Sequence, residues 1–553
     1  MKKNKPLRIF YFTLVASFLA GLACSKKAGP PPPPNQCIVN GTDTCKNRKT
    51  SIFINLNDEK QLIHSFGASD GWTAKFIGKW ADANKKTKIA DYLFSMDTAS
   101  DGIPKGIGLS LWRVYIGAGS FEQGANSEIP DEWRREECFL QADSSYNWNK
   151  QAGSQWFLNE AKQRGVKYTL GFAISAPVYM TLDGKAHGGG RSSFNLQSGK
   201  MPDYAEFLAE VSDHFKFDYI SPFNEPQWNW GNGNASQEGS AATNTEIANL
   251  VKLLGPKLQS RSLATSIVAG EAAQWNFTTN TYDNNRGDQI YNWFSPASSN
   301  YIGNVPNTAK IISAHSYFTT CPDNNLINIR TGVVNKRNAV DAGLGLWQTE
   351  FGILGDICGQ YNGYPKNISI DYGLYVAKMI HHDLAIANVS SWQWWLSMNP
   401  YNYSDGLVYV SDPSGINNPG YDANLNACKT DGIVTDSKQL WCFGNYSRFV
   451  RPGMKRIAAS IEGIADDISA AGSLMISAYK DVINKKLVFV IVNMKADAKT
   501  FKLAGLGSTI KIAGNNLDVY KTTATKSLSR SVTAADNINI EAKSVTTLVG
   551  TYD

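Results

Sequence analysis

The sequence predicts an α/β protein in which a (β/α)8 barrel, the TIM-barrel architecture, is followed by a C-terminal antiparallel β-sandwich. Short apolar runs alternate with helical patterns from about residue 62 to residue 396, which is typical of a parallel sheet with helical crossovers. After about residue 448 the pattern changes to period-two alternation of apolar and polar residues, separated by turns. That pattern indicates antiparallel strands.

The barrel is predicted from strand-like runs, because eight parallel strands are enough to close a barrel of this kind. These runs lie at 62–68, 107–116, 166–174, 218–223, 266–270, 310–315, 345–350 and 390–396. Helical patterns lie between several of them, at 151–164, 202–215, 244–259, 327–342 and 372–388. The expected barrel domain spans residues 50–447.

The β-sandwich is expected over residues 448–553, where helix signals are few and strand-like runs follow one another. The short run at 51–56, SIFINL, precedes the barrel. We expect this strand to pair with the sandwich and so to tie the two domains together.

The N-terminus predicts export. A basic region is followed by an apolar stretch from Ile9 to Ala23, which together indicate a signal peptide over residues 1–23. The stretch is too short to span a membrane. The basic region is formed by Lys2, Lys3, Lys5 and Arg8.

Cys24 at the end of this stretch resembles the lipidated cysteine of a bacterial lipoprotein, although Gly21 stands where such signals usually have Leu. An ordinary signal peptide with an unrelated cysteine is the alternative. Residues 24–49 form the expected linker, in which Pro30 to Pro34 would act as a stiff spacer. We therefore expect an exported, outer-membrane lipoprotein of a Gram-negative bacterium, either periplasmic or on the cell surface, that meets the membrane only through its lipid.

Composition restricts the partners. The net charge is +6, without a basic block, which argues against nucleic acid as a partner. Aromatic residues make up 11% of the chain, and many tryptophans stand beside Asn, Gly and Ser. They indicate either a large core or open grooves lined by aromatic faces, as in sugar-binding proteins. We expect a monomer.

The cysteines predict disulfides but no metal site. Eight are present, so seven remain beside Cys24 and at least one is unpaired. Local spacing favours two pairs, Cys37 with Cys45 and Cys428 with Cys442. Because neither a C-x-x-C motif nor an H-x-x-x-H or similar ligand pair occurs, we expect no catalytic metal and no cofactor.

The first candidate catalytic residue is Glu225, within the motif SPFNEP at 221–226. The motif follows a strand-like run, and the carboxyl ends of barrel strands form the face on which such barrels carry out chemistry. Pro226 favours an extended conformation at Glu225. Taken alone, the motif is also compatible with a simple loop turn.

The second candidate is Glu350, within LWQTEFG at 346–352. It ends an apolar strand between Trp347 and Phe351, which is unusual for a solvated charge. A buried structural glutamate paired with an arginine is the alternative interpretation.

The two glutamates together predict glycoside hydrolysis. Carboxylates at two strand ends of one barrel can face each other across its mouth, and this reaction needs one protonated acid and one ionised carboxylate. Their surroundings must therefore push their pKa values apart.

With these motifs the chain resembles glycoside hydrolase family 30, within the clan of retaining (β/α)8 enzymes. The resemblance covers nearly everything after residue 50 and includes SRFVRPG at 447–453, which is similar to the family's entry into its side domain. It implies that Glu225 is the general acid/base and Glu350 the nucleophile. It also implies that Asn224 hydrogen-bonds the 2-hydroxyl of the sugar.

The resemblance extends to further substrate-binding positions. It places Arg113 in contact with the nucleophile, where a cation favours the ionised carboxylate. His315 and Tyr317 follow the sixth strand, where the family places groups that orient the nucleophile; a core histidine is the alternative for His315. The eighth strand contributes Trp392, Trp394 and Trp395, of which period two puts the first two on one face and the third on the other. Which face points inward stays open.

The first strand continues as FGASDGW at 66–72, where many family members have an Asp that holds sugar hydroxyls. This position is Asp70, and Trp72 follows it. The arrangement is similar to the endo-β-1,6-galactanase branch, which implies hydrolysis of β-1,6-linked galactan in arabinogalactan side chains. A β-1,6-glucanase, a xylanase and a glucosylceramidase remain alternatives within the family, and a carbohydrate-binding lipoprotein without activity is the non-enzyme alternative.

Overall fold

The computed structural model describes residues 38–39, 42–43, 49–232, 235–415, 424–505 and 512–552. The chain divides into two compact units, Met1–Arg48 and Lys49–Asp553. In the first, β1 (Ile38–Val39) pairs antiparallel with β2 (Thr42–Asp43). The expected signal peptide, Cys24, the proline spacer, Cys37 and Cys45 lie outside the described residues. Among the residues that are described, no helix has the length and apolarity needed to cross a membrane.

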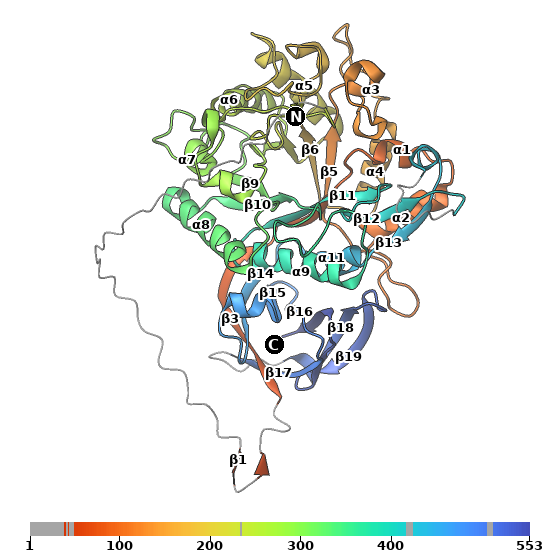
Figure 1. Cartoon of the computed structure of the whole chain (residues 1–553). Helices are drawn as coiled ribbons and strands as arrows, with labels where there is room; N and C mark the ends of the chain where they lie inside the picture. The colour runs from red at the N-terminus through yellow and green to blue at the C-terminus, as the bar shows by residue number, and fades with distance from the viewer. Residues whose placement is uncertain are drawn as a thin grey trace, which may run out of the picture. The chain divides into compact units, whose positions relative to one another are not determined.

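The second unit contains a TIM-like barrel (Figure 1). Neighbouring strands pair in parallel from β4 to β8 and from β9 to β11, and β11 pairs with β4. Isolated parallel bridges, Ile267–Thr308 and Ala272–Ala314, connect the segments around β8 and β9. All the strand runs of the predicted barrel are therefore present. They are β4 (Ser65–Ser69), β5 (Leu111–Ile116), β6 (Tyr168–Ala173), β7 (Tyr219–Ser221), β8 (Ser266–Ile267), β9 (Ile311–His315), β10 (Gly345–Glu350) and β11 (Ser391–Asn399).

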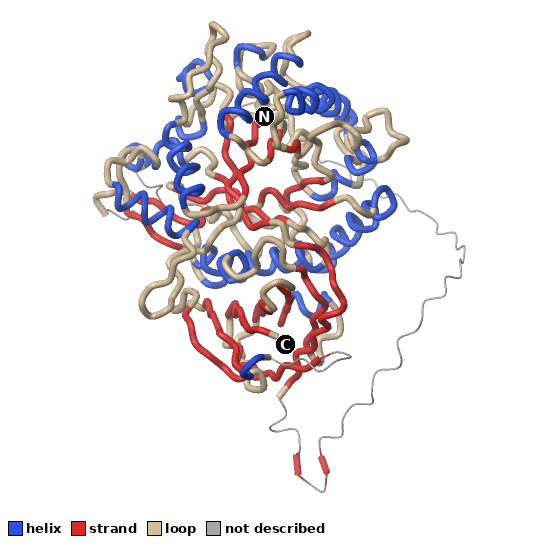
Figure 2. Tube along the Cα trace, turned by 180° about the vertical axis from the view of Figure 1, so that it is seen from behind, coloured by secondary structure: helices blue, strands red, loops and turns tan. Residues whose placement is uncertain are grey.

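Helices surround the barrel strands on the outside (Figure 2). Helix α6 shows why these segments are helical: Thr243 caps its first turn reciprocally with Glu246, and its apolar residues recur on one buried face. The longer helices are α2 (Ala83–Phe94), α4 (Ala152–Gln163), α5 (Met201–Phe215), α6 (Asn244–Ser260), α7 (Gln289–Phe294), α8 (Asp323–Asp341), α9 (Ile370–Ala385) and α11 (Lys438–Ser447), and the short ones are α1 (Ala74–Ile77), α3 (Ser120–Gln123), α10 (Leu425–Cys428) and α12 (Asp467–Ala471).

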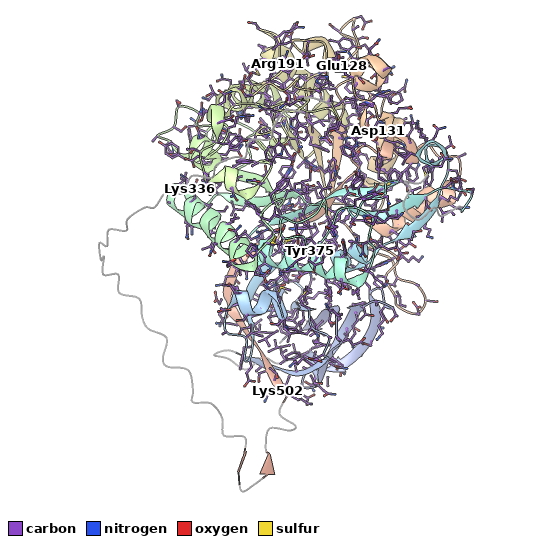
Figure 3. The ribbon with its side chains drawn as sticks, viewed as in Figure 1. Glu128, Asp131, Arg191, Lys336, Tyr375 and Lys502 are labelled. Carbon is purple, nitrogen blue, oxygen red and sulfur yellow. A yellow bond between two sulfur atoms is a disulfide. The ribbon has the colours of Figure 1, made fainter. Side chains whose placement is uncertain are left out.

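Two further strands extend the barrel sheet beyond β11, and the sequence pattern did not predict them. Strand β12 (Gly406–Ser411) pairs with β11, and β13 (Ile433–Asp436) pairs antiparallel with β12. The chain then enters α11, which together with α9 contacts the strands of the C-terminal sheet. Tyr375 of α9, labelled in Figure 3, is buried and stacks on Tyr361 of the loop after β10, with ring centroids 4.0 Å apart.

The C-terminal part is a sheet of nine strands around a second hydrophobic core. Strand β3 (Thr50–Leu62), which precedes the barrel, lies between β14 and β17. Its pairing with β17 is parallel, so the sheet is mixed and not purely antiparallel as predicted. The other strands are β14 (Lys455–Ile461), β15 (Leu474–Asp481), β16 (Lys486–Asn493), β17 (Lys499–Gly505), β18 (Asn516–Thr522), β19 (Ser529–Ala534), β20 (Ile538–Ile540) and β21 (Ser544–Thr551).

Arg448 joins the end of α11 to the barrel. Its guanidinium donates hydrogen bonds to the carbonyl oxygens of Ser95, Met96, Asp97 and Gly106, at 2.6–3.0 Å. One rigid cation thereby satisfies four carbonyl groups of the segment that leads into β5. The motif at 447–453 therefore has a structural role at the junction between the two parts.

The disulfide pattern differs from the local expectation. Cys321 is bonded to Cys358, a pair separated by 37 residues. Cys428 and Cys442 are both free and buried, so their predicted pairing is wrong. They lie on different helices, α10 and α11, and their separation of fourteen positions in sequence says nothing about where those helices place them.

Candidate active site

A pocket with a volume of about 320 Å³ opens among the loops that follow the barrel strands. Glu225, Glu350 and Asn224 line it. The other lining side chains are largely aromatic: Trp72, Trp228, Trp230, Tyr317, Phe318, Trp395 and Tyr403. This is the face of the barrel on which the sequence placed the two candidate carboxylates.

Glu225 follows β7 in a strained backbone conformation, and not in the extended one predicted from Pro226. Its φ is +47°, a left-handed value that bulky residues seldom adopt. Two backbone hydrogen bonds hold this conformation: the N–H of Glu225 donates to the carbonyl of Glu271 at 2.9 Å, and the carbonyl of Glu225 accepts from the N–H of Trp228 at 3.1 Å. The turn directs a buried carboxyl group, 8% exposed, into the pocket.

Glu350 is the last residue of β10, where the register with β9 shifts between Gln348 and Glu350. Its Oε2 accepts from Nη1 of Arg113 at 2.8 Å, and its Oε1 accepts from the hydroxyl of Tyr317 at 3.2 Å. Arg113 is fully buried at the middle of β5. Glu350 is therefore held by one cation and one neutral donor.

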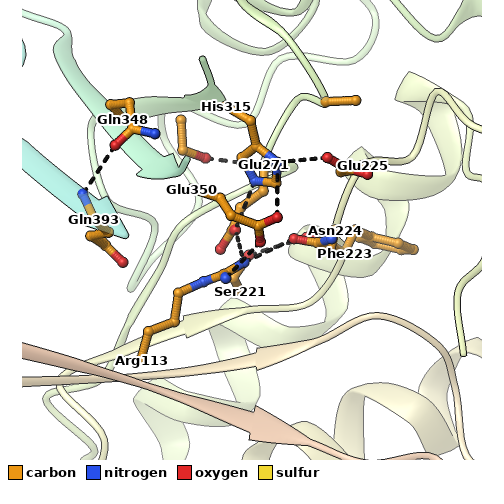
Figure 4. A network of polar contacts seen from close by, with 12 residues as sticks. Arg113, Ser221, Phe223, Asn224, Glu225, Glu271, His315, Gln348, Glu350 and Gln393 are labelled. Carbon is orange, nitrogen blue, oxygen red and sulfur yellow. Dashed lines mark hydrogen bonds and ion pairs between the residues drawn. The ribbon is translucent and has the colours of Figure 1, made fainter. Parts of the chain in front are cut away.

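His315 joins the two pocket glutamates (Figure 4). Its Nδ1 lies 2.8 Å from Oε1 of Glu225 and 3.8 Å from Oε1 of Glu350. One carboxylate oxygen from each glutamate and one ring nitrogen of His315 all lie within 4.8 Å of one another. The two carboxyl groups thus face each other across a short gap.

Glu271 is a third buried carboxylate that the sequence analysis missed. It contacts Nη2 of Arg113 and lies 3.4 Å from Nε2 of His315. Its backbone φ is +33°, so the two glutamates joined by the Glu225 N–H hydrogen bond are both in the left-handed region. Its position after the apolar run at 266–270 was the available signal, because it matches that of Glu225 and Glu350 at their own strand ends.

The surroundings separate the carboxyl groups electrostatically. Burial raises the pKa of Glu225, and the charge of Glu350 raises it further against the opposing effect of His315. Burial is the largest single effect on Glu271 and would raise its pKa, but the charge of Arg113 together with the hydrogen bond and charge of His315 outweighs it, so the pKa of Glu271 is lowered. For His315, burial is outweighed by the charge of Glu350 and by hydrogen bonds to Glu225 and Glu271, which raise its pKa to about 9. The site therefore raises the pKa of Glu225 above that of an ordinary glutamate, while His315 stays a cation at neutral pH.

The same three groups bear on metal binding, since two carboxylates and an imidazole form a common ligand set. Here two protein cations already lie next to the carboxylates. One is the guanidinium of Arg113, and the other is His315, whose raised pKa favours binding of a proton over binding of a metal ion. The donor set therefore fits acid–base chemistry between the carboxylates better than it fits a metal ion.

Most of the predicted binding residues meet at this site. Arg113, His315 and Tyr317 contact the candidate carboxylates directly. Oδ1 of Asn224 accepts from Arg113 at 2.8 Å. Trp72 lines the pocket and packs edge-to-face against Trp395, with ring centroids 5.0 Å apart.

Three predicted binding residues lie elsewhere. Trp392 and Trp394 point out of the barrel into the surrounding core, where their indole N–H groups donate to Asp383 and to the carbonyl of Asp405. Trp395 alone of the three enters the pocket, because adjacent strand residues face opposite sides. Asp70 is fully buried and accepts the N–H of Tyr115 at 2.9 Å, so it supports the barrel and does not line the pocket.

The sequence analysis also missed two polar side chains that line the pocket. Asp405 precedes β12 and lines the pocket together with Arg134, whose guanidinium lies 4.8 Å from the ring centre of Trp72. Burial raises the pKa of Asp405 to about 6. These two polar side chains line the pocket together with tryptophan rings, and so provide hydrogen-bonding groups next to apolar faces, as polyhydroxylated ligands require.

The chain is similar to known glycoside hydrolases. A family model described as O-glycosyl hydrolase family 30 matches residues 49–409. An endo-β-1,6-galactanase of Hypocrea rufa is 25% identical over 289 residues, which cover 48% of this chain and 55% of that protein, so the chain spans about half the length of this curated relative.

Solved structures extend the similarity to nearly the whole chain. A conserved exported protein from Bacteroides fragilis is 33% identical with a TM-score of 0.82, covering 90% of this chain and all of that one. The catalytic domain of a family 30 xylanase from Talaromyces cellulolyticus shares the fold, with 22% identity, a TM-score of 0.63 and coverage of 91% of this chain and 100% of that one. The family model covers well over half of the chain, which therefore belongs to glycoside hydrolase family 30.

Proposed function

We propose that this glycoside hydrolase is a retaining endo-glycosidase that cleaves β-1,6-linked galactan, as in arabinogalactan side chains, by double displacement. The observation that carries the mechanism is the short gap between Glu225 and Glu350, in which one oxygen of each lies within 4.8 Å of the other. Retaining enzymes keep their carboxyl groups about 5–5.5 Å apart, whereas inverting enzymes separate them by about 6.5–9.5 Å to admit a water molecule.

In the first step, protonated Glu225 donates its proton to the glycosidic oxygen as the carboxylate of Glu350 attacks the anomeric carbon. The bond to the leaving sugar breaks, and a covalent glycosyl–Glu350 ester forms. In the second step Glu225, now ionised, takes a proton from water, which attacks the same carbon and releases Glu350. The raised pKa of Glu225 supports its role as the acid in the first step.

The surrounding residues orient this pair. Arg113 and Tyr317 hold the two oxygens of Glu350, so that the carboxylate is fixed in position. Because Oδ1 of Asn224 accepts from Arg113, its NH₂ group remains to donate to the sugar 2-hydroxyl, a contact that strengthens in the transition state. This mechanism uses no metal and no cofactor.

The galactan specificity rests on the galactanase of Hypocrea rufa. This specificity is tested by measuring the rate at which the purified enzyme hydrolyses β-1,6-galactan, β-1,6-glucan, glucuronoxylan and glucosylceramide in parallel assays. We expect internal cleavage of the galactan, seen as a fall in chain length before monosaccharide accumulates. Faster cleavage of another polymer would reassign the substrate within the family.

Retention is tested independently by following the anomeric protons by NMR during the first minutes of the reaction. We expect the first-formed product to have the β configuration. An α product formed first would exclude the double displacement, whichever polymer is the best substrate.

The finer architecture and the location of the protein are part of this proposal. We infer a complete (β/α)8 barrel domain over residues 50–447, whose first strand, β3, pairs with the C-terminal sheet, and a sandwich-like β domain over 448–553, working as a monomer. The signal pattern ending at Cys24 supports export and lipid anchoring, and the similar protein of Bacteroides fragilis is named as exported.

A further inference from the structure

Two apolar side chains at the mouth of the pocket are largely exposed. Phe318 and Leu354 line the same cavity as Glu225 and Glu350, yet each is 54% exposed. They come from different loops, Phe318 from the one after β9 and Leu354 from the one after β10. Exposed apolar groups at a pocket entrance are surface that a ligand can cover.

Both loops are fixed in place. The disulfide between Cys321 and Cys358 joins them, three residues after Phe318 and four residues after Leu354. On the β9 side, fully buried Arg330 donates to the carbonyl of Thr319 at 2.8 Å. Phe318 itself has a φ of +58°, which a bulky residue keeps only where its surroundings enforce it. The exposed position of Phe318 is therefore built into the loop.

Phe318 belongs to the Glu225 side of the pocket. Its ring meets that of Trp228 edge-on, with centroids 6.1 Å apart, and the Trp228 N–H donates to the carbonyl of Glu225. Trp230 on the same wall donates its indole N–H to that carbonyl at 3.2 Å. The acid of a retaining glycosidase protonates the oxygen of the leaving group, so the leaving group must lie on the side of the acid.

We propose that Phe318 and Leu354, held by the Cys321–Cys358 bridge, form the subsite for the leaving-group sugar, a β-galactopyranose unit next to the bond that is cleaved. The inference rests on the proposed function, since it takes Glu225 as the acid. Galactopyranose presents C–H groups on one face and hydroxyls on the other. An exposed aromatic ring, together with a second exposed apolar side chain that lines the same pocket, can cover the C–H face while the hydroxyls stay in water.

The subsite is tested through transglycosylation. The glycosyl–enzyme intermediate is attacked either by water or by an acceptor sugar that occupies the leaving-group position. We would supply β-1,6-galactobiosyl fluoride as the donor and β-1,6-galactobiose as the acceptor. Fluoride is chosen as the leaving group because it is too small to reach Phe318 and Leu354. Both products arise from one intermediate, so the ratio of transfer to hydrolysis reports acceptor binding alone.

We expect Phe318→Ala to lower this ratio about tenfold, because aromatic packing of this kind changes binding by that order. Phe318→Tyr should restore the ratio, since its ring is retained. Ile357→Ala is the matched control: Ile357 is 59% exposed on the β10 loop but does not line the pocket, so its ratio should equal that of the wild type.

The outcomes separate the two proposals. A wild-type ratio in Phe318→Ala would overturn the subsite while leaving the retaining mechanism intact. Failure of the wild-type enzyme to react with the galactosyl donor would overturn the proposed galactanase function and, with it, the identity of the sugar in the subsite.

The disulfide gives a second measurement. We expect the double variant Cys321→Ser/Cys358→Ser to lower the ratio of transfer to hydrolysis about threefold, a change of the same sign as that of Phe318→Ala. The reason is that the loops after β9 and β10 are then no longer joined. An unchanged ratio in the double variant would show that the disulfide does not position Phe318 and Leu354.

Discussion

Glu271 and Arg113 form an ion pair in which both side chains are completely buried. Arg113 also binds Glu350, and Glu271 also faces His315. Two cations, Arg113 and protonated His315, are thereby balanced by two carboxylates, Glu271 and Glu350. The balance leaves Glu225 as the group that can hold a proton without an excess of charge in the site.

Replacing Glu271 by Gln should move the basic limb of the pH profile. The substitution removes one negative charge beside Arg113 and His315, which makes the potential at Glu225 more positive and lowers its pKa. Because the acid must be protonated, the basic limb of kcat/KM should shift to lower pH by about one unit. The shift is measured from the pH dependence of kcat/KM on one soluble substrate. The pH range runs from about 4 to about 10, from roughly the ordinary pKa of Glu to roughly that of Lys.

The control is Glu271→Asp, which keeps the charge and should keep the limb near its wild-type position. Glu271→Gln is also expected to lower the free energy of unfolding by roughly 3–5 kcal/mol, because it leaves Arg113 partly unpaired in the interior. Assays therefore run well below its unfolding temperature. A basic limb that does not move would show that Glu271 has only this structural role.

His315 should make stability fall on the alkaline side. Its pKa is raised to about 9 in the folded protein, against about 6.5 when unfolded. The stabilisation is fully present below about pH 6.5 and is lost as the pH rises through 9, which amounts to roughly 3 kcal/mol. Urea unfolding at pH 6 and pH 9.5 measures it.

The variant His315→Asn should lose most of this difference between the two pH values. If wild type and variant lose the same free energy of unfolding between pH 6 and pH 9.5, the alkaline loss comes from other groups.

The strand-end glutamates could be predicted because of a geometric rule. Parallel strands of a barrel present their carboxyl ends on one face, so Glu225 and Glu350 had to lie near each other once the runs before them were recognised as strands. Glu271 obeys the same rule but has no motif around it. Its importance depends on Arg113, a partner 158 residues away that only the folded chain brings into contact.

Other features could not be read from the sequence for similar reasons. Period two divides Trp394 and Trp395 between two faces but contains no information about which face points inward. The pairing of Cys321 with Cys358 depends on two loops that meet over the pocket, whereas spacing alone favoured a neighbouring pair that is not formed.

The lipid anchor is tested by Cys24→Ser, at a position outside the described residues. We expect the variant to move from the membrane fraction to the soluble fraction of an expressing Gram-negative cell. Lipid chains supply about 0.8 kcal/mol of binding free energy per buried CH₂, and Lys26 and Lys27 are too few charges to replace them. Immunoblots of the membrane and soluble fractions measure this distribution. A wild-type protein that is already in the soluble fraction would show that Cys24 belongs to a cleaved signal.

The proposed catalytic pair, Glu225 and Glu350, gives the most direct prediction. Glu225→Gln and Glu350→Gln should each keep the fold and lower galactan hydrolysis by about 100- to 10,000-fold or more, because each removes one half of the acid–nucleophile chemistry. Glu128→Gln is the control, since Glu128 is an exposed partner of Lys185 outside the pocket and should keep wild-type activity.

Added azide separates the two roles on an aryl β-galactoside, whose leaving group needs little acid assistance. In Glu225→Ala the intermediate still forms on Glu350, and azide should release the β-galactosyl azide. In Glu350→Gly azide attacks the substrate directly in place of the carboxylate, so the product should be the α-galactosyl azide. NMR of the isolated azides distinguishes them, and the opposite pair of products would exchange the roles of Glu225 and Glu350.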